Sequence, residues 1–364
     1  MATAFEYQFP AIRGVQAGRE FYVSQCPLRL IPKLFTFDDS ELPVEIRAQR
    51  TLNRSRLPEI AQYVIENRDN YVFSAITASI DAEVRFESIG NTTGDGDGRV
   101  GLLHVPMSAR FIINDGQHRR GAIELALNED PTLGDETIAV VFFLDLGLER
   151  CQQMFADLNR YAVKPSASIG VLYDHRDPLS SITRAVVAKI PLLLDLVEFE
   201  KTALALKSRK LFTLSAVFNA NRALLAGRGE HTSDQIDLVE AFWSGVIPSF
   251  PEWKAVHDRS LSSAEVRRDF IHSHGTVLHA LGNIGNTLIN DPPVDWDAMS
   301  AGLNGINWSR SNVALWEGRA MIAGRVSKSA QNVALTTNAI KQHLHIQLSP
   351  EEQRIEDAFS RGAK

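Results

Sequence analysis

Hydrophobic and polar residues alternate along much of the first half of the chain. The alternation predicts strands at residues 5–14 and 19–26, joined as a hairpin at 15–18. Residues 71–80 and 82–89 show the same pattern and predict a second hairpin. This part of the chain is therefore expected to contain an antiparallel sheet.

Helical spacing is interleaved with these strands. Residues 57–66 place Ile60 and Val64 on one face of a predicted helix. The uninterrupted apolar run 137–144 predicts a strand that is buried on both faces, and a helix is expected at 147–160. Strands that alternate with helices predict an α/β (α+β) lobe with a mixed sheet and at least one crossover connection.

After Pro165 the pattern becomes almost entirely helical. The predicted helices span 168–173, 179–189, 212–225, 234–247, 263–271 and 276–289. Residues 201–210 are a basic connector, and the last charged residues before 363–364 are expected to fray. The change in pattern divides the chain into an α/β domain at 1–165 and a mainly α-helical C-terminal domain at 166–364.

The composition is that of an ordinary globular protein, with 44% hydrophobic and 23% charged residues in a chain of 364. No apolar stretch is long enough to span a bilayer, and residues 1–6 lack the features of a signal peptide, so a cytoplasmic location is expected. The two cysteines, Cys26 and Cys151, exclude a disulfide scaffold and a cysteine-rich zinc site. The net charge of −6 argues against a non-specific polybasic binder, although lysines and arginines cluster locally.

Residues 111–123 carry the most informative pattern. An apolar run ends at Ile113, Asn114-Asp115-Gly116 is typical of a turn, and Asp115 is a suitable N-cap for a following helix. The unpaired N–H groups of a helix start, with Arg119 and Arg120 beside them, would form an anion site, most often for phosphate. The plain alternative is a glycine-containing turn with two solvated arginines.

The pentapeptide Asp115-Gly116-Gln117-His118-Arg119 is the signature of the DGQHR-domain proteins, which resemble the N-terminal domain of ParB-like proteins. Within that group the chain resembles the DndB family, regulators associated with DNA phosphorothioation gene clusters. Residues 51–56, 155–160 and 265–275 carry the rest of the resemblance. It implies a ParB-like N-terminal lobe that holds a nucleotide or DNA phosphate at the signature turn.

The expected roles at this turn follow from side-chain chemistry. Arg119 would bind phosphate oxygens through two hydrogen bonds, Gly116 would let phosphate approach the backbone, and His118 would act as acid or base. Asp115 would cap the helix or hold water or Mg²⁺. The catalytic candidates are therefore Asp115 and His118. The candidate phosphate- or nucleotide-binding residues are Gly116, Gln117, Arg119, Arg120, Arg54, Arg56, Asn159 and Arg160. For Arg160, a local helix pair with Asp157 is an equally good explanation.

Other residues are candidates for DNA or redox chemistry. The candidate DNA-binding residues are Arg54, Arg56, Lys207, Arg209, Lys210, Arg267 and Arg268. The histidines of 257–279 lack the spacing of a zinc-binding helix, so no metal site is expected. Cys26 is a redox candidate because of the nearby basic segment, although most isolated cysteines are small buried apolar residues. Cys151 is expected in the core.

The sequence is compatible with two main functions and with a third. The first is a DNA-binding transcriptional repressor of a DNA phosphorothioation (dnd) gene cluster. It is expected to bind double-stranded promoter DNA as a homodimer, and gating by ATP or CTP with Mg²⁺ is left open. The alternative is an enzyme at the signature turn, a nucleotide hydrolase (ATPase or CTPase) or a DNA-nicking enzyme. The third is an interaction subunit that binds other phosphorothioation proteins. None of these functions involves a membrane.

Overall fold

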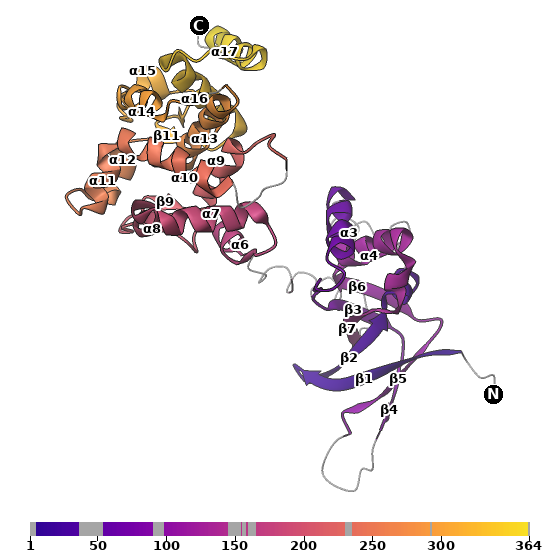
Figure 1. Ribbon diagram of the computed structural model, residues 1–364. Helices are drawn as coiled ribbons and strands as arrows, with labels where there is room; N and C mark the ends of the chain where they lie inside the picture. The colour runs from indigo at the N-terminus through magenta and orange to yellow at the C-terminus, as the bar shows by residue number, and fades with distance from the viewer. Residues whose placement is uncertain are drawn as a thin grey trace. The chain divides into compact units, whose positions relative to one another are not determined.

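The computed structural model describes residues 5–35, 54–89, 98–144, 154, 158, 165–229, 235–291 and 293–362 (Figure 1). The chain divides into two compact units, residues 1–163 and 164–364. The first contains a mixed sheet with helices and the second is mainly helical, which confirms the α/β fold class.

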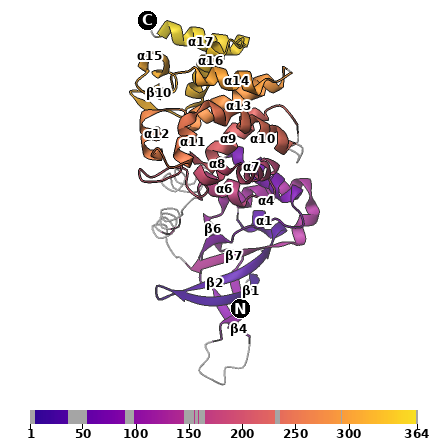
Figure 2. The ribbon, with the colours of Figure 1, turned by 60° about the vertical axis from the view of Figure 1, so that its left-hand side comes forward.

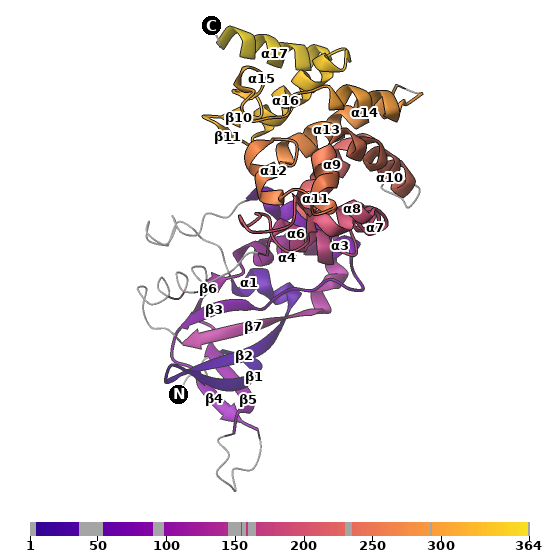
Figure 3. The ribbon, with the colours of Figure 1, turned by 90° about the vertical axis from the view of Figure 1, so that its left-hand side faces the viewer.

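A seven-stranded mixed sheet forms the first unit, in the order β4-β5-β1-β2-β7-β3-β6 (Figures 2 and 3). The strands are β1 (Glu6–Gln16), β2 (Arg19–Pro27), β3 (Ile76–Asp81), β4 (Arg85–Ser88), β5 (Val100–Pro106), β6 (Arg110–Asp115) and β7 (Thr137–Leu144). The predicted hairpin of β1 and β2 is confirmed. Its turn is only Ala17-Gly18, whose positive φ angles of 51° and 73° suit the right-handed twist of the two strands.

The second predicted hairpin is wrong. β3 pairs with β6 and, in parallel, with β7, whereas β4 pairs with β5. The cause is burial. Ile76, Ala78, Ser79 and Ile80 are all buried, so β3 requires neighbours on both edges, whereas β4 is largely exposed and lies at the edge of the sheet. The parallel pair β3–β7 is joined by a long connection that includes β4 to β6, not by a single crossover helix.

β7 lies where it was predicted, but it is not buried on both faces. Ile138, Val140 and Phe142 are buried, whereas Thr137 before them and Ala139 between them are exposed. The buried residues belong to the core formed with the helices of this unit, so one face of the strand is covered much better than the other.

Helices supply the other half of this core. They are α1 (Ile31–Leu34), α3 (Leu57–Glu66) and α4 (Gln117–Glu129), with the short 3₁₀ turns η1 (Leu28–Leu30), η2 (Arg54–Arg56) and η3 (Pro131–Asp135). The predicted helix 57–66 is confirmed, and α3 packs along α4. Of the helix predicted at 147–160, the structure describes only Met154 and Leu158, both helical.

The second unit confirms the helical prediction for the C-terminal half. Its helices are α6 (Ala167–Tyr173), α7 (Pro178–Lys189), α8 (Pro191–Leu196), α9 (Leu214–Leu224), α10 (Gln235–Val246), α11 (Pro251–His257), α12 (Ser263–Asp269), α13 (Gly275–Ile289), α14 (Trp296–Asn304), α15 (Val313–Trp316), α16 (Ala330–His343) and α17 (Pro350–Gly362), with the 3₁₀ turn η4 (Ile247–Ser249). Two short strand pairs are added, β8 (Val197–Glu198) with β9 (Phe212–Thr213) and β10 (Met321–Ile322) with β11 (Arg325–Val326).

The buried helix α13 is central to this unit and packs against α9 and α16. Gly282 allows the close approach of α9, since a Cβ at this position would collide with the carbonyl oxygen of Ala220. The charged residues just before 363–364, which were expected to fray, belong to the helix α17, and residues 363–364 lie outside the described residues. Glu356 of this helix is buried and forms an ion pair with Arg319, whose guanidinium also lies 4.5 Å from the ring of Phe359.

Candidate functional site

The signature turn is a strand-to-helix corner in the first unit. β6 continues through Asn114 to Asp115, and the turn consists of Gly116 alone, which is the N-cap of α4. Asp115 is therefore not the N-cap, contrary to the prediction, because it still pairs with Thr77 of β3 as the last residue of the strand. The register of β3 and β6 shifts at Asn114, which is buried and donates to the Ser79 hydroxyl oxygen at 2.8 Å.

Gly116 is required by the backbone of this corner. Its φ is +110°, a conformation that other residues rarely adopt. A Cβ at this position would lie 3.0 Å from Cγ1 of Ile76 and 3.2 Å from Nη2 of Arg119. The glycine is thus explained by chain geometry and by the arginine packed over it, before any phosphate is considered.

Arg119 joins the start of α4 to the segment that precedes β3. Its Nη1 donates to the Ser74 hydroxyl oxygen at 2.7 Å, and its Nη2 donates to the Ala75 carbonyl oxygen at 3.1 Å and to Oδ2 of Asp115 at 2.7 Å. The side chain is only 20% exposed. Arg119 and Asp115 thus bind each other and the protein, while phosphate binding by Arg119 and a metal ion or water at Asp115 stay predictions.

Arg120 is also used within the fold. Its Nε donates to the Phe35 carbonyl oxygen at 2.9 Å and its Nη2 to that of Pro32 at 3.1 Å, while Nη1 forms an ion pair with Glu124. Arg120 therefore ties α4 to the region of α1, and its role in phosphate binding stays a prediction. Gln117 donates to the Ile113 carbonyl oxygen at 3.3 Å.

The structure does bring the two predicted basic segments of this unit together. Burial lowers the pKa of His118, and the positive charges of Arg56 and Arg119 lower it further, against the opposing effect of Asp115. Arg56, at the end of η2, is exposed and close enough to His118 to act on it. For Arg54 only the backbone is described, and Asn159, Arg160 and Cys151 lie outside the described residues.

Cys26 has the environment of a core residue. It is fully buried in β2 and burial raises the pKa of its thiol to about 12. Such a thiol stays protonated, so the structure argues against the predicted role as a redox sensor.

In the second unit, Arg267 of α12 shapes the basic connector. Its Nη2 donates to the carbonyl oxygens of Ala205, Leu206 and Ser208 at 3.0, 3.0 and 3.1 Å. Its role as a DNA contact stays a prediction. Two neighbouring candidates for DNA binding, Arg268 and Lys210, also donate to oxygen atoms of the protein. Arg268 binds both carboxylate oxygens of Asp269 at 2.7 Å, and Nζ of Lys210 donates to the Asp195 carbonyl oxygen at 2.5 Å.

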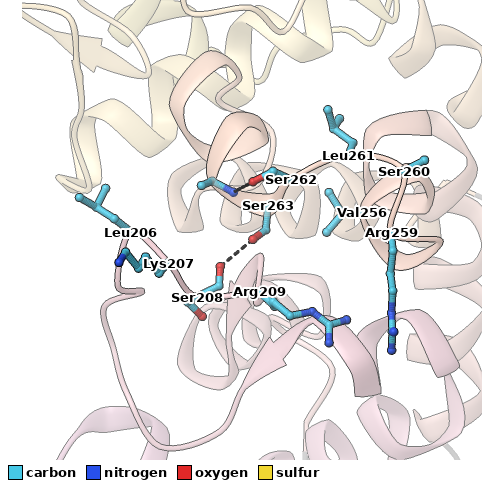
Figure 4. Close-up of a pocket in the computed structure, with 11 residues that line it drawn as sticks. Leu206, Lys207, Ser208, Arg209, Val256, Arg259, Ser260, Leu261, Ser262 and Ser263 are labelled. Carbon is cyan, nitrogen blue, oxygen red and sulfur yellow. Dashed lines mark hydrogen bonds between the residues drawn. The ribbon is translucent and has the colours of Figure 1, made fainter.

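Three other cations of this region line one pocket of about 520 Å³ (Figure 4). Lys207 and Arg209 come from the connector and Arg259 from the turn after α11. All three are exposed, and their side chains make no hydrogen bond or ion pair with any described residue. Arg209 and Arg259 extend toward the same side of the pocket in Figure 4. We did not predict Arg259, because a segment remote in sequence brings it to the connector.

The fold therefore combines an α/β unit with a glycine-containing corner and a helical unit that presents unpaired cations. A family model described as "DNA-sulfur modification-associated" matches residues 9–347, which makes the chain a protein of DNA sulfur modification. It belongs to the DndB family, as the resemblance implied. No curated protein and no solved structure matches the chain significantly. Within the described residues, no helix is long and apolar enough to cross a membrane.

Proposed function

We propose that the chain is a DNA-binding repressor of a DNA phosphorothioation gene cluster. The observation that supports this proposal is the group of three unpaired cations, Lys207, Arg209 and Arg259, in a protein of the DndB family. These three residues are called the cationic edge below. Arg267 and Arg268 were equally good candidates for DNA binding in the sequence. Both donate hydrogen bonds to oxygen atoms of the protein, so we expect them to contribute less to DNA binding.

The physical argument rests on charge that the fold leaves uncompensated. A chain with a net charge of −6 is not attracted to DNA as a whole, so binding requires a local surface on which cations outnumber carboxylates. No Asp or Glu is among the described residues that line the pocket of the cationic edge. Binding of DNA phosphates there would release counterions, which makes the affinity dependent on salt.

Mobility-shift titrations with promoter DNA and with a scrambled duplex of equal length test this proposal. Log affinity is expected to fall linearly with log salt, by about 0.9 per phosphate neutralised. Replacing all three residues of the cationic edge with alanine should reduce the slope by about 2.7, whereas Arg268→Ala should leave it nearly unchanged because Asp269 neutralises that charge. A triple variant with the slope and affinity of the wild type would exclude this surface.

We further propose that the protein binds the operator as a homodimer. A two-fold symmetric footprint with half-sites about 10 base pairs apart would agree with this arrangement. A single asymmetric footprint from a protein that sediments as a monomer would contradict it.

A second function, nucleotide binding that gates the affinity for DNA, is favoured by the start of α4. That helix start has no side-chain cap, and Arg56 and His118 lie near each other there. Both N–H groups and cations suit phosphate. The test is equilibrium binding of ATP and CTP with Mg²⁺, together with phosphate release, for the wild type, Arg56→Ala and His118→Ala. We expect weaker binding in both variants, and absence of binding of either nucleotide to the wild type would refute the proposal.

A further inference from the structure

A different pocket of the helical unit, of about 430 Å³, lies among α12, the start of α13 and the connector. Its volume is within the range of small-molecule sites, roughly 300–1,000 Å³. Four cations line it, Arg267, Arg268, Arg310 and Lys328, and none of the described residues that line it is acidic.

Two of these cations carry donors that the protein does not satisfy. Burial lowers the pKa of Arg267 and of Arg310. Nη1 of Arg267 and Nε of Arg310 are buried and have no hydrogen-bond partner in the described structure. The nearby carboxylate of Asp269 is already bound by Arg268 through both oxygens. Buried donors without partners cost free energy, and an anion in the pocket would supply the missing acceptors.

Arg310 is held in place through one of its terminal nitrogens. Its Nη2 donates to the Arg267 carbonyl oxygen at 2.9 Å and to Nε2 of His274 at 2.8 Å. Nε2 of His274 also lies 3.1 Å from the same carbonyl oxygen of Arg267. The two guanidinium groups are therefore held in place by backbone and imidazole contacts, while one buried donor on each remains available.

The start of α13 contributes to the same pocket. This helix has 15 residues, and its N-cap, His274, provides no side-chain cap. Ser273 lines the pocket, is only 5% exposed, and its hydroxyl has no partner within the described residues. Cε of Lys328 lies 3.8 Å from the position that a Cβ on Gly275 would occupy, so this cation lies over the helix start.

From these contacts we infer that the pocket binds a phosphorylated small molecule, whose phosphoryl group is held by Arg267, Arg310, Ser273 and the start of α13. The inference does not depend on the proposed DNA binding, because Lys207, Arg209 and Arg259 line the other pocket and not this one.

The apolar lining indicates an organic group beside the phosphate. Leu204, Leu206 and Leu211 line the pocket together with the cations. An inorganic phosphate ion would leave this apolar part unfilled, whereas an ester would bury it. Duplex DNA is a poor occupant, since a rod of its width cannot bring phosphate to buried atoms such as Nε of Arg310.

Calorimetric titration of the full chain with inorganic phosphate, AMP and adenosine, at constant ionic strength in chloride, tests this inference. We expect AMP to bind more tightly than inorganic phosphate, and adenosine not to bind. Ser273→Ala should weaken both ligands about fivefold, through loss of one hydrogen bond. It should keep the wild-type melting temperature, because that hydroxyl has no partner in the part of the chain that the structure describes. Ser273→Asp should abolish binding, since its carboxylate would occupy the site.

Lysine variants provide a matched pair. Lys328→Ala should weaken binding of AMP several-fold, whereas Lys207→Ala, with the same loss of charge in the neighbouring pocket, should leave it unchanged. Absence of binding of both phosphate ligands, or binding that persists in Ser273→Asp, would overturn the inference. If inorganic phosphate binds and AMP does not, the inference that the ligand is a phosphate ester would be wrong. Loss of duplex DNA binding in Ser273→Asp, with no binding of AMP, would assign the pocket to DNA instead.

Discussion

The substitution Arg119→Ala separates a structural arginine from a ligand-binding one at the signature corner. It removes hydrogen bonds to the Ser74 hydroxyl and the Ala75 carbonyl oxygen, and an ion pair with Asp115. The two hydrogen bonds come from a charged donor on a largely buried side chain, whereas the 49% exposed Asp115 makes the ion pair worth less than 1 kcal/mol. The expected loss is about 3 kcal/mol in the free energy of unfolding.

The distribution of aromatic residues allows this loss to be assigned to one unit. All five tryptophans, from Trp243 to Trp316, lie in the second unit. Tryptophan fluorescence therefore reports the helical unit, and far-UV circular dichroism reports both. For a unit of this size, 3 kcal/mol corresponds to a decrease of about 6–12 °C in melting temperature. We expect it in the dichroism signal, with little change in fluorescence.

Two further variants complete the experiment. Arg119→Lys should recover only part of the stability, since an ammonium group cannot reach three acceptors in the geometry of a guanidinium. Arg56→Ala, on an exposed side chain of the same corner, should melt within about 0.5 kcal/mol of the wild type. If Arg119→Ala keeps the wild-type midpoint in dichroism but loses nucleotide binding, Arg119 is a ligand contact and its described contacts contribute little.

Two other predictions concern stability. Gly116→Ala should lower the free energy of unfolding by about 2 kcal/mol or more, because it combines a positive φ with contact to Ile76. Gly18→Ala, also at positive φ but with nothing within 4 Å, should cost only the backbone strain. Equal losses of unfolding free energy for the two variants in urea titrations would contradict the contact argument. Burial lowers the pKa of His274 to about 4, and the charges of Arg310, Lys328 and His272 lower that pKa further. The contribution of His274 to stability is therefore complete above pH 6.5 and is lost as the pH falls toward 4. Between pH 7 and 5 the wild type should lose about 2 kcal/mol more than His274→Gln by tryptophan fluorescence, and parallel pH profiles would refute the assignment.

Local periodicity predicted several elements correctly. The hairpin of β1 and β2, the helix α3 and the position of β7 depend on alternation or helical spacing within a short stretch, which the sequence displays directly. The pairing of β3 with β6 and β7 could not be obtained in this way. The pairing depends on how much surface each strand must bury. Strands that follow each other in the sequence are therefore not always neighbours in this sheet.

The candidate site shows the same limit at the level of single side chains. The sequence identified the glycine corner and its arginines. Several acceptors of Arg119 and Arg120, however, are backbone oxygens, which carry no signal in side-chain identity; they belong to Ala75, Phe35 and Pro32. Arg259 was missed for the related reason that it reaches the connector from a distant segment.

The connector held by Arg267 forms a common wall of the two pockets of the helical unit. Leu206 and Ala264 line both of them, and the three carbonyl oxygens that Arg267 binds fix the path of the chain between them. Any ligand that shifts this wall from one side alters the shape available on the other, and by thermodynamic linkage the effect is reciprocal. Occupancy of one pocket would thus be communicated to the other through residues that line both, and a substitution of Arg267 would change both at once.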